Sequence, residues 1–254
     1  MKLTSIRAIL VALSLAASAA LSQEPKAPTA SNPPKLSADE VAKVKAILAE
    51  VQKLTVEKHY FDALKKVDEA DAMVPNSAVI WNVRGSVYTA FREFDKAREA
   101  FTKAREAMPQ AFEPQFNLTE LLYVEQHYSE AREAFQKLLK DFPKLRETVR
   151  HLVLFKILVC MLKEGDAAGA QEIQKNFTSM DDTPAYFYSK AAVAYSQGNP
   201  TEATSWLEKA ERIFKKEQNA VYIDALGEAR WYPSFEVPQI PSEKNKGEAP
   251  PKSP

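Results

Sequence analysis

The side chains best suited to chemistry in this chain are three histidines and a single cysteine. A histidine beside a cysteine can activate a thiolate nucleophile, and histidines grouped with carboxylates can hold a metal ion. His151 and Cys160 fall in one predicted helix, where their nine-residue separation puts them on opposite faces and about 13 Å apart. His59 and His127 each lie in a predicted turn with no second ligand nearby in sequence. We therefore expect neither a Cys–His nucleophile nor a metal site.

Other chemistry is disfavoured by spacing and composition. Asp166, Asp181 and Asp182 lack the alternating ligand positions and distal glutamate of a calcium loop, so we expect them at turns and helix starts. The chain has six glycines and neither a G-x-G-x-x-G nor a P-loop motif. Lys+Arg and Asp+Glu both number 34, so no basic excess is available for phosphates. The sequence predicts no catalytic residues, no cofactor and no nucleic-acid partner.

Residues 1–22 have the pattern of a secretory signal peptide. Lys2 and Arg7 supply a positive start, and the apolar stretch Ala8–Leu21 ends in small residues. The alternative is an uncleaved membrane anchor, but 14 residues fall short of the roughly 20 needed to span a bilayer. No cysteine lies at the junction for lipid attachment. We expect a cleaved, periplasmic or secreted protein that is not a lipoprotein and has no stable membrane insertion.

The remaining chain divides by composition into three parts. Residues 23–36 and 233–254 are rich in proline and polar residues, which predicts a flexible linker and a disordered tail. Between them, residues 37–232 carry helical apolar spacing and almost no strand pattern. Ser37 followed by Glu40 predicts a capping box at the first helix of this block.

The helical block repeats itself with a period of 34 residues. Four kinds of position recur at this step: a small residue, a helix-stopping proline, an aromatic residue and a bulky apolar residue. In that order they are Ala63, Ala97 and Ala131; Pro75, Pro109 and Pro143; Tyr60, Phe94 and Tyr128; and Val67, Phe101 and Phe135. Such a period indicates stacked supersecondary units that bury their apolar faces against one another.

The second repeat reads Trp81-x-x-Arg84-Gly85-x-x-Tyr88, then Ala97-x-x-x-Phe101, then Pro109. This resembles the tetratricopeptide pattern W-x-x-L-G-x-x-Y…A-x-x-x-F…P and departs from it at Arg84. The third repeat has Thr119 at the small position of the first helix, and two weaker units follow at 151–178 and 185–214. The resemblance implies an all-α, right-handed α-solenoid of about five helical hairpins. One more helix, over 215–231, would cap the last hairpin.

In tetratricopeptide folds the first helices of successive hairpins line a concave groove that holds the ligand. By this resemblance the groove here presents Asn82, Ser86, Thr89, Phe116, Glu120, Tyr123, Tyr186 and Ser189 as partner-binding residues. Amide and aromatic side chains of this kind suit an extended peptide. Leu48 and Gln52 stand where the carboxylate clamp of chaperone-binding relatives has Lys and Asn, which argues against that clamp.

The leading functional hypothesis is a non-catalytic protein–protein interaction scaffold or adaptor in the cell envelope. Its partner would be a protein or peptide. The alternatives are a carrier of a small apolar or glycan ligand, suggested by the aromatic groove residues, and an envelope-assembly factor. An enzyme would require His and acidic side chains to meet in three dimensions in a way that the spacing does not predict.

Overall fold

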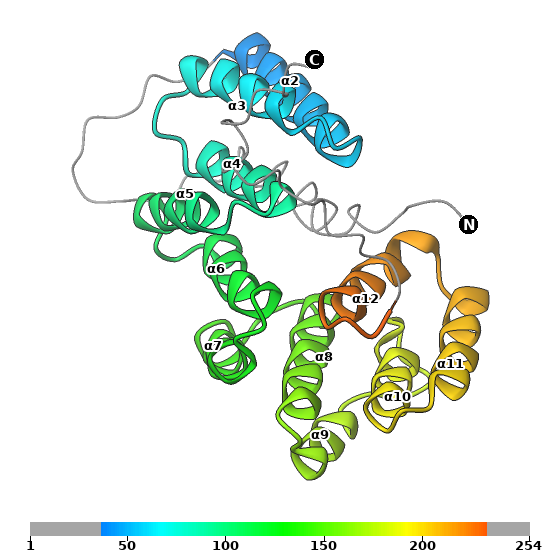
Figure 1. The fold of residues 1–254 in the computed structure, drawn as a ribbon. Coiled ribbons are helices and arrows are strands. Elements are labelled where there is room, and N and C mark those ends of the chain that lie inside the picture. Colours follow the sequence, from blue (N-terminus) through cyan, green and yellow to red (C-terminus); the bar gives the residue numbers. More distant parts are fainter. Residues whose placement is uncertain (1–36, 233–254) are drawn as a thin grey trace, which may run out of the picture.

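The computed structural model describes residues 37–232, so the predicted signal peptide, linker and tail lie outside the described residues. Every regular element within them is an α-helix (Figure 1). The helices are α2 (Ala38–Val56), α3 (Tyr60–Met73), α4 (Ala78–Phe91), α5 (Phe94–Ala107), α6 (Phe112–Val124), α7 (Tyr128–Asp141), α8 (Glu147–Lys163), α9 (Ala167–Gln174), α10 (Ala185–Ser196), α11 (Pro200–Ile213) and α12 (Lys216–Glu228).

Consecutive helices pair into five hairpins, followed by α12. The pairs are α2–α3, α4–α5, α6–α7, α8–α9 and α10–α11, and neighbouring hairpins stack on one another (Figure 1). First helices also contact one another, α2 with α4, α4 with α6, and α8 with α10. We call the side of the stack lined by these first helices the inner face. The predicted all-α solenoid of about five helical hairpins is confirmed.

The repeated positions have the packing roles that their residue types suggested. Ala63, Ala97 and Ala131 have no exposed surface, because each lies where the two helices of its hairpin approach most closely. The recurring aromatic residue is the first residue of α3, α5 and α7. The recurring proline lies just after each of these helices, where its missing N–H ends the helix.

One more position recurs in every repeat, and it is recognised by its backbone conformation and not by its residue type. Each hairpin turns through one residue of positive φ, five residues before its small alanine. These residues are Lys58 (φ 64°), Arg92 (67°), Gln126 (67°), Gly165 (82°) and Gly198 (74°). The left-handed conformation favours glycine, yet only the last two hairpins use glycine there. The same turn therefore joins all five hairpins, with a strained residue in the first three.

Gly85 marks a close helix contact in the second hairpin. A Cβ atom at this position would lie 2.5 Å from Cδ1 and Cε1 of the Phe101 ring on α5. Thr119 takes the equivalent position in the third hairpin and is buried, with its hydroxyl donating to the Gln115 carbonyl oxygen. The Trp–Gly–Tyr pattern thus sets how closely α4 approaches α5.

Helix α8 is the most completely buried element of the described chain. All residues from His151 to Met161 are buried, and they include most of the apolar run Leu152–Leu162. Ala170, the small residue of the fourth hairpin, follows Ala131 by 39 residues instead of 34, and α8, with 17 residues against 13 in α6, accommodates much of this difference. No helix between residues 37 and 232 is long and apolar enough to cross a membrane.

Local signals at the helix starts are also confirmed. The Ser37 side chain accepts a hydrogen bond from the backbone N–H of Glu40, whose carboxylate accepts from the Ser37 backbone, completing the predicted capping box. Asp166 caps α9 by accepting from the Gly169 N–H, and Asn199 caps α11 in the same way.

The inner face and the C-terminal helix as the candidate functional site

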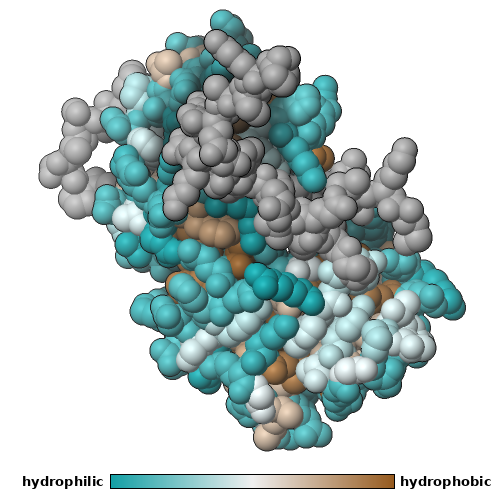
Figure 2. Space-filling view, in the orientation of Figure 1, coloured by the Kyte–Doolittle hydropathy of each residue, from teal (hydrophilic) through white to brown (hydrophobic). Residues whose placement is uncertain are grey.

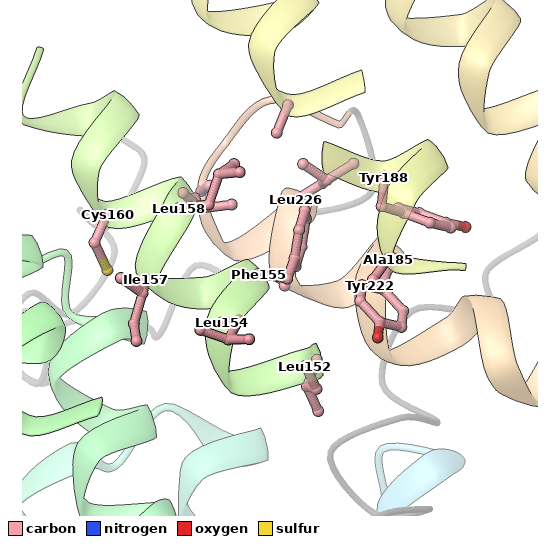
Figure 3. Packing of buried hydrophobic residues seen from close by; sticks show 14 of the residues in the cluster. Leu152, Leu154, Phe155, Ile157, Leu158, Cys160, Ala185, Tyr188, Tyr222 and Leu226 are labelled. Carbon is pink, nitrogen blue, oxygen red and sulfur yellow. The ribbon is translucent and has the colours of Figure 1, made fainter. Parts of the chain in front are cut away.

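The predicted last helix is present as α12, but it does more than cover the last hairpin. It contacts α11, and it also packs against α8 and α10 of the fourth and fifth hairpins (Figure 1). Figure 3 shows Phe155 of α8 and Tyr188 of α10 beside Tyr222 of α12. The Phe155 and Tyr222 ring centroids lie 5.1 Å apart, and those of Tyr188 and Tyr222 lie 5.2 Å apart. Helix α12 therefore lies on the inner face.

The C-terminal end of α12 reaches back to the second and third hairpins. The Tyr123 hydroxyl on α6 donates to the Ala225 carbonyl oxygen at 2.7 Å. Arg92, at the α4–α5 turn, donates from Nη1 to the Glu228 carboxylate at 3.1 Å. With the Gln126 amide oriented so that its oxygen faces Arg230, that oxygen accepts from Nε at 2.6 Å and Nη2 at 2.9 Å. These contacts join residues up to 136 positions apart in the chain.

We call the contact between α12 and the inner face the seam. Just beyond α12, Trp231 extends this seam along the inner face. Its ring stacks on Tyr195 of α10 at a centroid distance of 6.5 Å. The Lys163 ammonium, at the end of α8, lies 4.1 Å from the Trp231 ring centroid, within cation–π distance. Trp231 thus reports whether the end of α12 is docked.

A buried ion pair links α6 and α8 next to this seam. Lys156 Nζ donates to Glu120 Oε1, and the two side chains are 5% and 8% exposed. The same ammonium lies 4.4 Å from the Tyr123 ring centroid. Because both charges are removed from water, each depends on the other for compensation. The other Glu120 oxygen is buried without a hydrogen-bond partner.

Burial dominates the electrostatics of these groups. Loss of solvation raises the pKa of the Glu228 carboxyl, and the Arg92 guanidinium offsets only part of the effect. Burial raises the pKa of the Tyr123 hydroxyl well above its usual value, which keeps it a hydrogen-bond donor. Burial also raises the pKa of the Cys160 thiol to about 12, so this side chain is a thiol rather than a reactive thiolate at neutral pH.

The predicted groove residues of α4 and α6 lie on the inner face but are largely covered. Asn82, Ser86, Thr89 and Glu120 are each less than a tenth exposed, and Tyr123 is fully buried. The hydroxyls of Ser86 and Thr89 donate to carbonyl oxygens of their own helix. The Asn82 carboxamide oxygen accepts from Asn117 on α6 at 2.8 Å. Much of the hydrogen-bonding capacity predicted for a partner is thus used within the protein.

The predicted aromatic and α10 residues are placed differently. Phe116 is half-buried and packs against Phe112 and against Phe135 of α7, within its own hairpin. Tyr186 is half-buried and lies edge-on to Trp206 of α11. Ser189 is fully buried, and its hydroxyl donates to the Tyr186 carbonyl oxygen. The structure therefore brings Glu120 and Tyr123 together with Lys156 but leaves Phe116 and Tyr186 in separate packing contacts.

Several residues of this site were missed by sequence reasoning. Arg92, Glu228 and Arg230 carry no distinguishing pattern, because their partners are far away in sequence. Lys156 did carry a signal. It is a single charge inside the apolar run Leu152–Leu162, and a buried lysine requires a partner.

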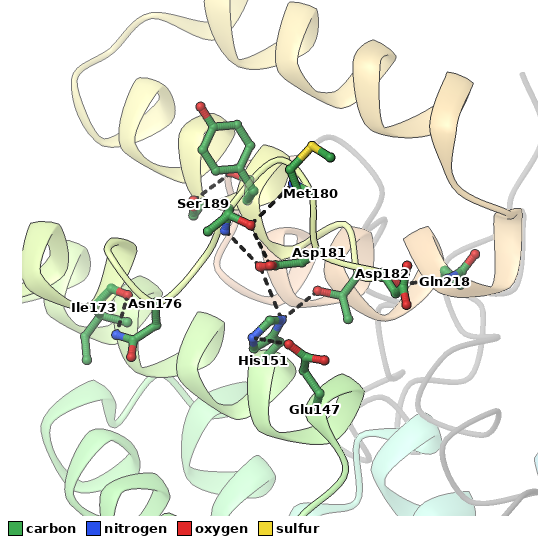
Figure 4. Close-up of polar contacts among 12 residues, drawn as sticks. Glu147, His151, Ile173, Asn176, Met180, Asp181, Asp182, Ser189 and Gln218 are labelled. Atoms are coloured by element: carbon green, nitrogen blue, oxygen red, sulfur yellow. Dashed lines mark hydrogen bonds and ion pairs between the residues drawn. The ribbon is translucent and has the colours of Figure 1, made fainter.

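Titratable groups also gather where α8 begins (Figure 4). The His151 Nδ1 atom lies 2.8 Å from the Thr183 hydroxyl, and its two ring nitrogens lie 3.7 and 3.9 Å from Glu147 and Asp181 oxygens. Burial would raise the pKa of Asp181, but hydrogen bonds from Thr178 outweigh it and lower the pKa. His151 and Thr183 are buried, so this group ties α8 to the 178–184 segment.

Metal-binding geometry is not found in the described part of the chain. No group of three or more His, Cys, Asp or Glu side chains between residues 37 and 232 is arranged to hold an ion. His59 and His127 are exposed residues at the starts of α3 and α7, as expected of turn histidines.

Comparison with known proteins agrees with this architecture. Residues 88–153 match the family model described as Tetratricopeptide repeat. No curated protein sequence matches the chain. The fold is similar to that of PilW, a widely conserved type IV pilus biogenesis factor (20% identity, TM-score 0.54, covering 74% of this chain and 88% of PilW). It is also similar to pilF of Pseudomonas aeruginosa (17%, 0.52, 78% and 95%) and to the APC/C hetero-tetramer Cut9–Hcn1 (16%, 0.55, 88% and 44%).

Structural likenesses at these identities establish the fold. Together with the repeat columns and the family match, they place the chain among the helical-repeat proteins. The described residues therefore have the fold of tetratricopeptide repeat proteins.

Proposed function

We propose that the protein is a non-catalytic protein–protein interaction scaffold of the cell envelope that holds a segment of its partner on the inner face. The observation that carries this proposal is that the inner face already binds a polypeptide segment. Side chains from four hairpins hold α12 through aromatic packing, a hydrogen bond from Tyr123 and an ion pair from Arg92. A surface that recognises one helix in this way has the chemistry needed to recognise another.

The packing of the repeats supports the same proposal. The residues of the 34-residue period are used in stacking, so the period itself carries no chemistry. At the start of α8, His151 is buried and its Nδ1 atom lies 2.8 Å from the buried Thr183 hydroxyl, which disfavours a substrate site there. Figure 2 shows a mainly hydrophilic face on which hydrophobic residues appear in small patches, as suits a protein that meets its partners from solution.

The cell-envelope location rests on residues 1–22, whose charge and apolar pattern predict a secretory signal. Fractionation of cells that express the full chain tests it. We expect the protein outside the cytoplasm, and a variant lacking residues 1–22 inside it. Equal distribution of the two would remove the envelope from the proposal. An assembly role in the envelope is a narrower form of the proposal, suggested by the likeness to a pilus biogenesis factor.

Site-specific photo-cross-linking tests the binding surface. A photoreactive amino acid at Gln52, half-buried on α2, samples the inner face, and one at Lys65, exposed on α3, samples the opposite side. After illumination in native cells, we expect adducts with a defined protein from position 52 and none from position 65. If neither position yields a protein adduct, or if both yield the same mixture, the scaffold proposal is wrong.

A further inference from the structure

Two of the residues that hold the end of α12 on the inner face lie in turns and take no part in the stacking of the hairpins. Arg92 and Gln126 occupy the same left-handed turn position in the second and third hairpins; Arg92 pairs with Glu228 at the end of α12, and Gln126, with its amide oxygen turned toward Arg230, pairs with that residue just beyond the helix. The fourth and fifth hairpins make the same turn with glycine, and the exposed Lys58 shows that the turn needs no particular side chain. The second and third turns thus carry a strained residue whose side chain meets α12.

The seam between α12 and the inner face is incompletely satisfied. The Tyr188 hydroxyl on α10 is buried without a hydrogen-bond partner, and so is one Glu120 oxygen on α6. Buried polar groups in native proteins are almost always paired, so the unpaired Tyr188 hydroxyl at this contact, and the unpaired Glu120 oxygen next to it, each add a cost. The Glu228 carboxylate is also buried at the end of this seam. Docking of α12 is therefore weaker than its buried area alone would suggest.

We propose that α12 is a removable occupant of the inner face, and that the partner protein binds by supplying a helix of the same chemistry in its place. This inference rests on the proposed scaffold function and adds the class of ligand and its control. Exchange would leave the five hairpins stacked, because α12 is not part of any hairpin. The same contacts that hold α12 would then hold the partner.

The face that α12 presents defines the ligand. Residues 224–229 are all buried, and among the buried residues Tyr222, Ala225 and Ala229 follow one another at spacings of three and four, on the same side of the helix. Glu228 adds a carboxylate at the end of that face, opposite Arg92. The matching partner segment is a helix with one aromatic residue, small residues one and two turns later, and an acidic residue near its C-terminal end.

The test uses the full chain and a fluorescent peptide with the sequence of residues 215–232. Glu228→Lys places a second positive charge beside Arg92, so it should undock α12 without touching the hairpins. We expect amide hydrogen exchange in residues 219–228 to accelerate and the wild-type peptide to bind this variant more tightly than the wild-type chain, each by about tenfold or more. Glu217→Lys makes the same charge change at an exposed position of α12 and serves as the matched control.

A charge exchange keeps the test informative if a single variant folds poorly. The double variant Arg92→Glu with Glu228→Lys restores opposite charges and should return hydrogen exchange in α12 toward the wild-type rate. A peptide carrying E228K should also bind the Arg92→Glu chain better than the wild-type peptide does.

Equal peptide affinity of the wild-type and Glu228→Lys chains, or α12 amides that exchange no faster in the variant, would overturn the exchange proposal. A further pattern separates it from the proposed function. If the peptide binds the Glu228→Lys chain but no protein is cross-linked at position 52, the scaffold proposal fails. The proposal that α12 can leave the inner face is then still supported.

Discussion

Replacing Lys156 by Met tests whether the inner face depends on its buried ion pair. Met keeps most of the volume and the apolar stem of the side chain but removes the ammonium from Glu120 and from the Tyr123 ring. Removing one partner of a buried pair leaves an uncompensated charge and costs about 3–5 kcal/mol. With the two side chains only 5% and 8% exposed, water cannot readily replace the lost partner. We expect a loss of this size in the free energy of unfolding.

The measurement is urea unfolding at neutral pH, followed by far-UV circular dichroism. Lys209→Met is the matched control, because Lys209 also lies over an aromatic ring, 3.8 Å from the Trp206 centroid, but on the exposed side of α11. Its loss should stay within about 1 kcal/mol. The double variant Lys156→Met with Glu120→Gln removes both charges and should recover much of the loss. If Lys156→Met costs no more than the control, or if Glu120→Gln recovers nothing, the pair is not a desolvated contact.

Three further predictions follow from other contacts. Gly85→Ala should lower stability by about 1–3 kcal/mol, seen as a lower Tm, because the new Cβ meets the Phe101 ring at 2.5 Å; an unchanged Tm would show that the ring moves freely. Lys58→Gly should raise stability by up to about 1 kcal/mol in urea unfolding, because it relieves a left-handed lysine, whereas Gly198→Ala should lower it by about 1 kcal/mol; effects in the opposite directions would contradict the shared turn. Glu228 has a raised pKa in the native state, so native protein holds this proton more tightly than the unfolded chain, and its contribution to stability falls as pH rises from 4.5 through the raised pKa. Glu228→Gln should therefore reduce the loss of stability as the pH rises above 4.5, measured by urea unfolding at a series of pH values, and an unchanged pH profile would refute the assignment.

Much of the fold was predictable because each hairpin contacts mainly its neighbours. Ala97 and Phe101 meet α4 in the same hairpin, and Pro109 ends that hairpin, so a period in sequence maps directly onto a period in space. The capping box at Ser37 is decided within four residues. Interactions of such short range leave their pattern in the order of residues.

The candidate site was less predictable, because it depends on contacts across the stack. The sequence indicated which helices line the inner face and named Glu120 and Tyr123 among its residues. It did not indicate that Lys156 pairs with Glu120 or that Tyr123 donates to the backbone of α12. The groove residues Phe116 and Tyr186 instead pack within their own hairpins. Which face a side chain uses depends on the rotation of each helix, and the repeat specifies that rotation only approximately.

The amino-acid sequence by itself determined the helical hairpins, their number and their order, since residues within about 34 positions of one another decide these. Only the tertiary structure decided where α12 lies, because Arg92 and Glu228 are 136 residues apart and nothing local to either residue requires the other. The curvature summed over several hairpins brings them together. This accumulated curvature decides whether the inner face is open or occupied. It also decides which residues a partner would meet.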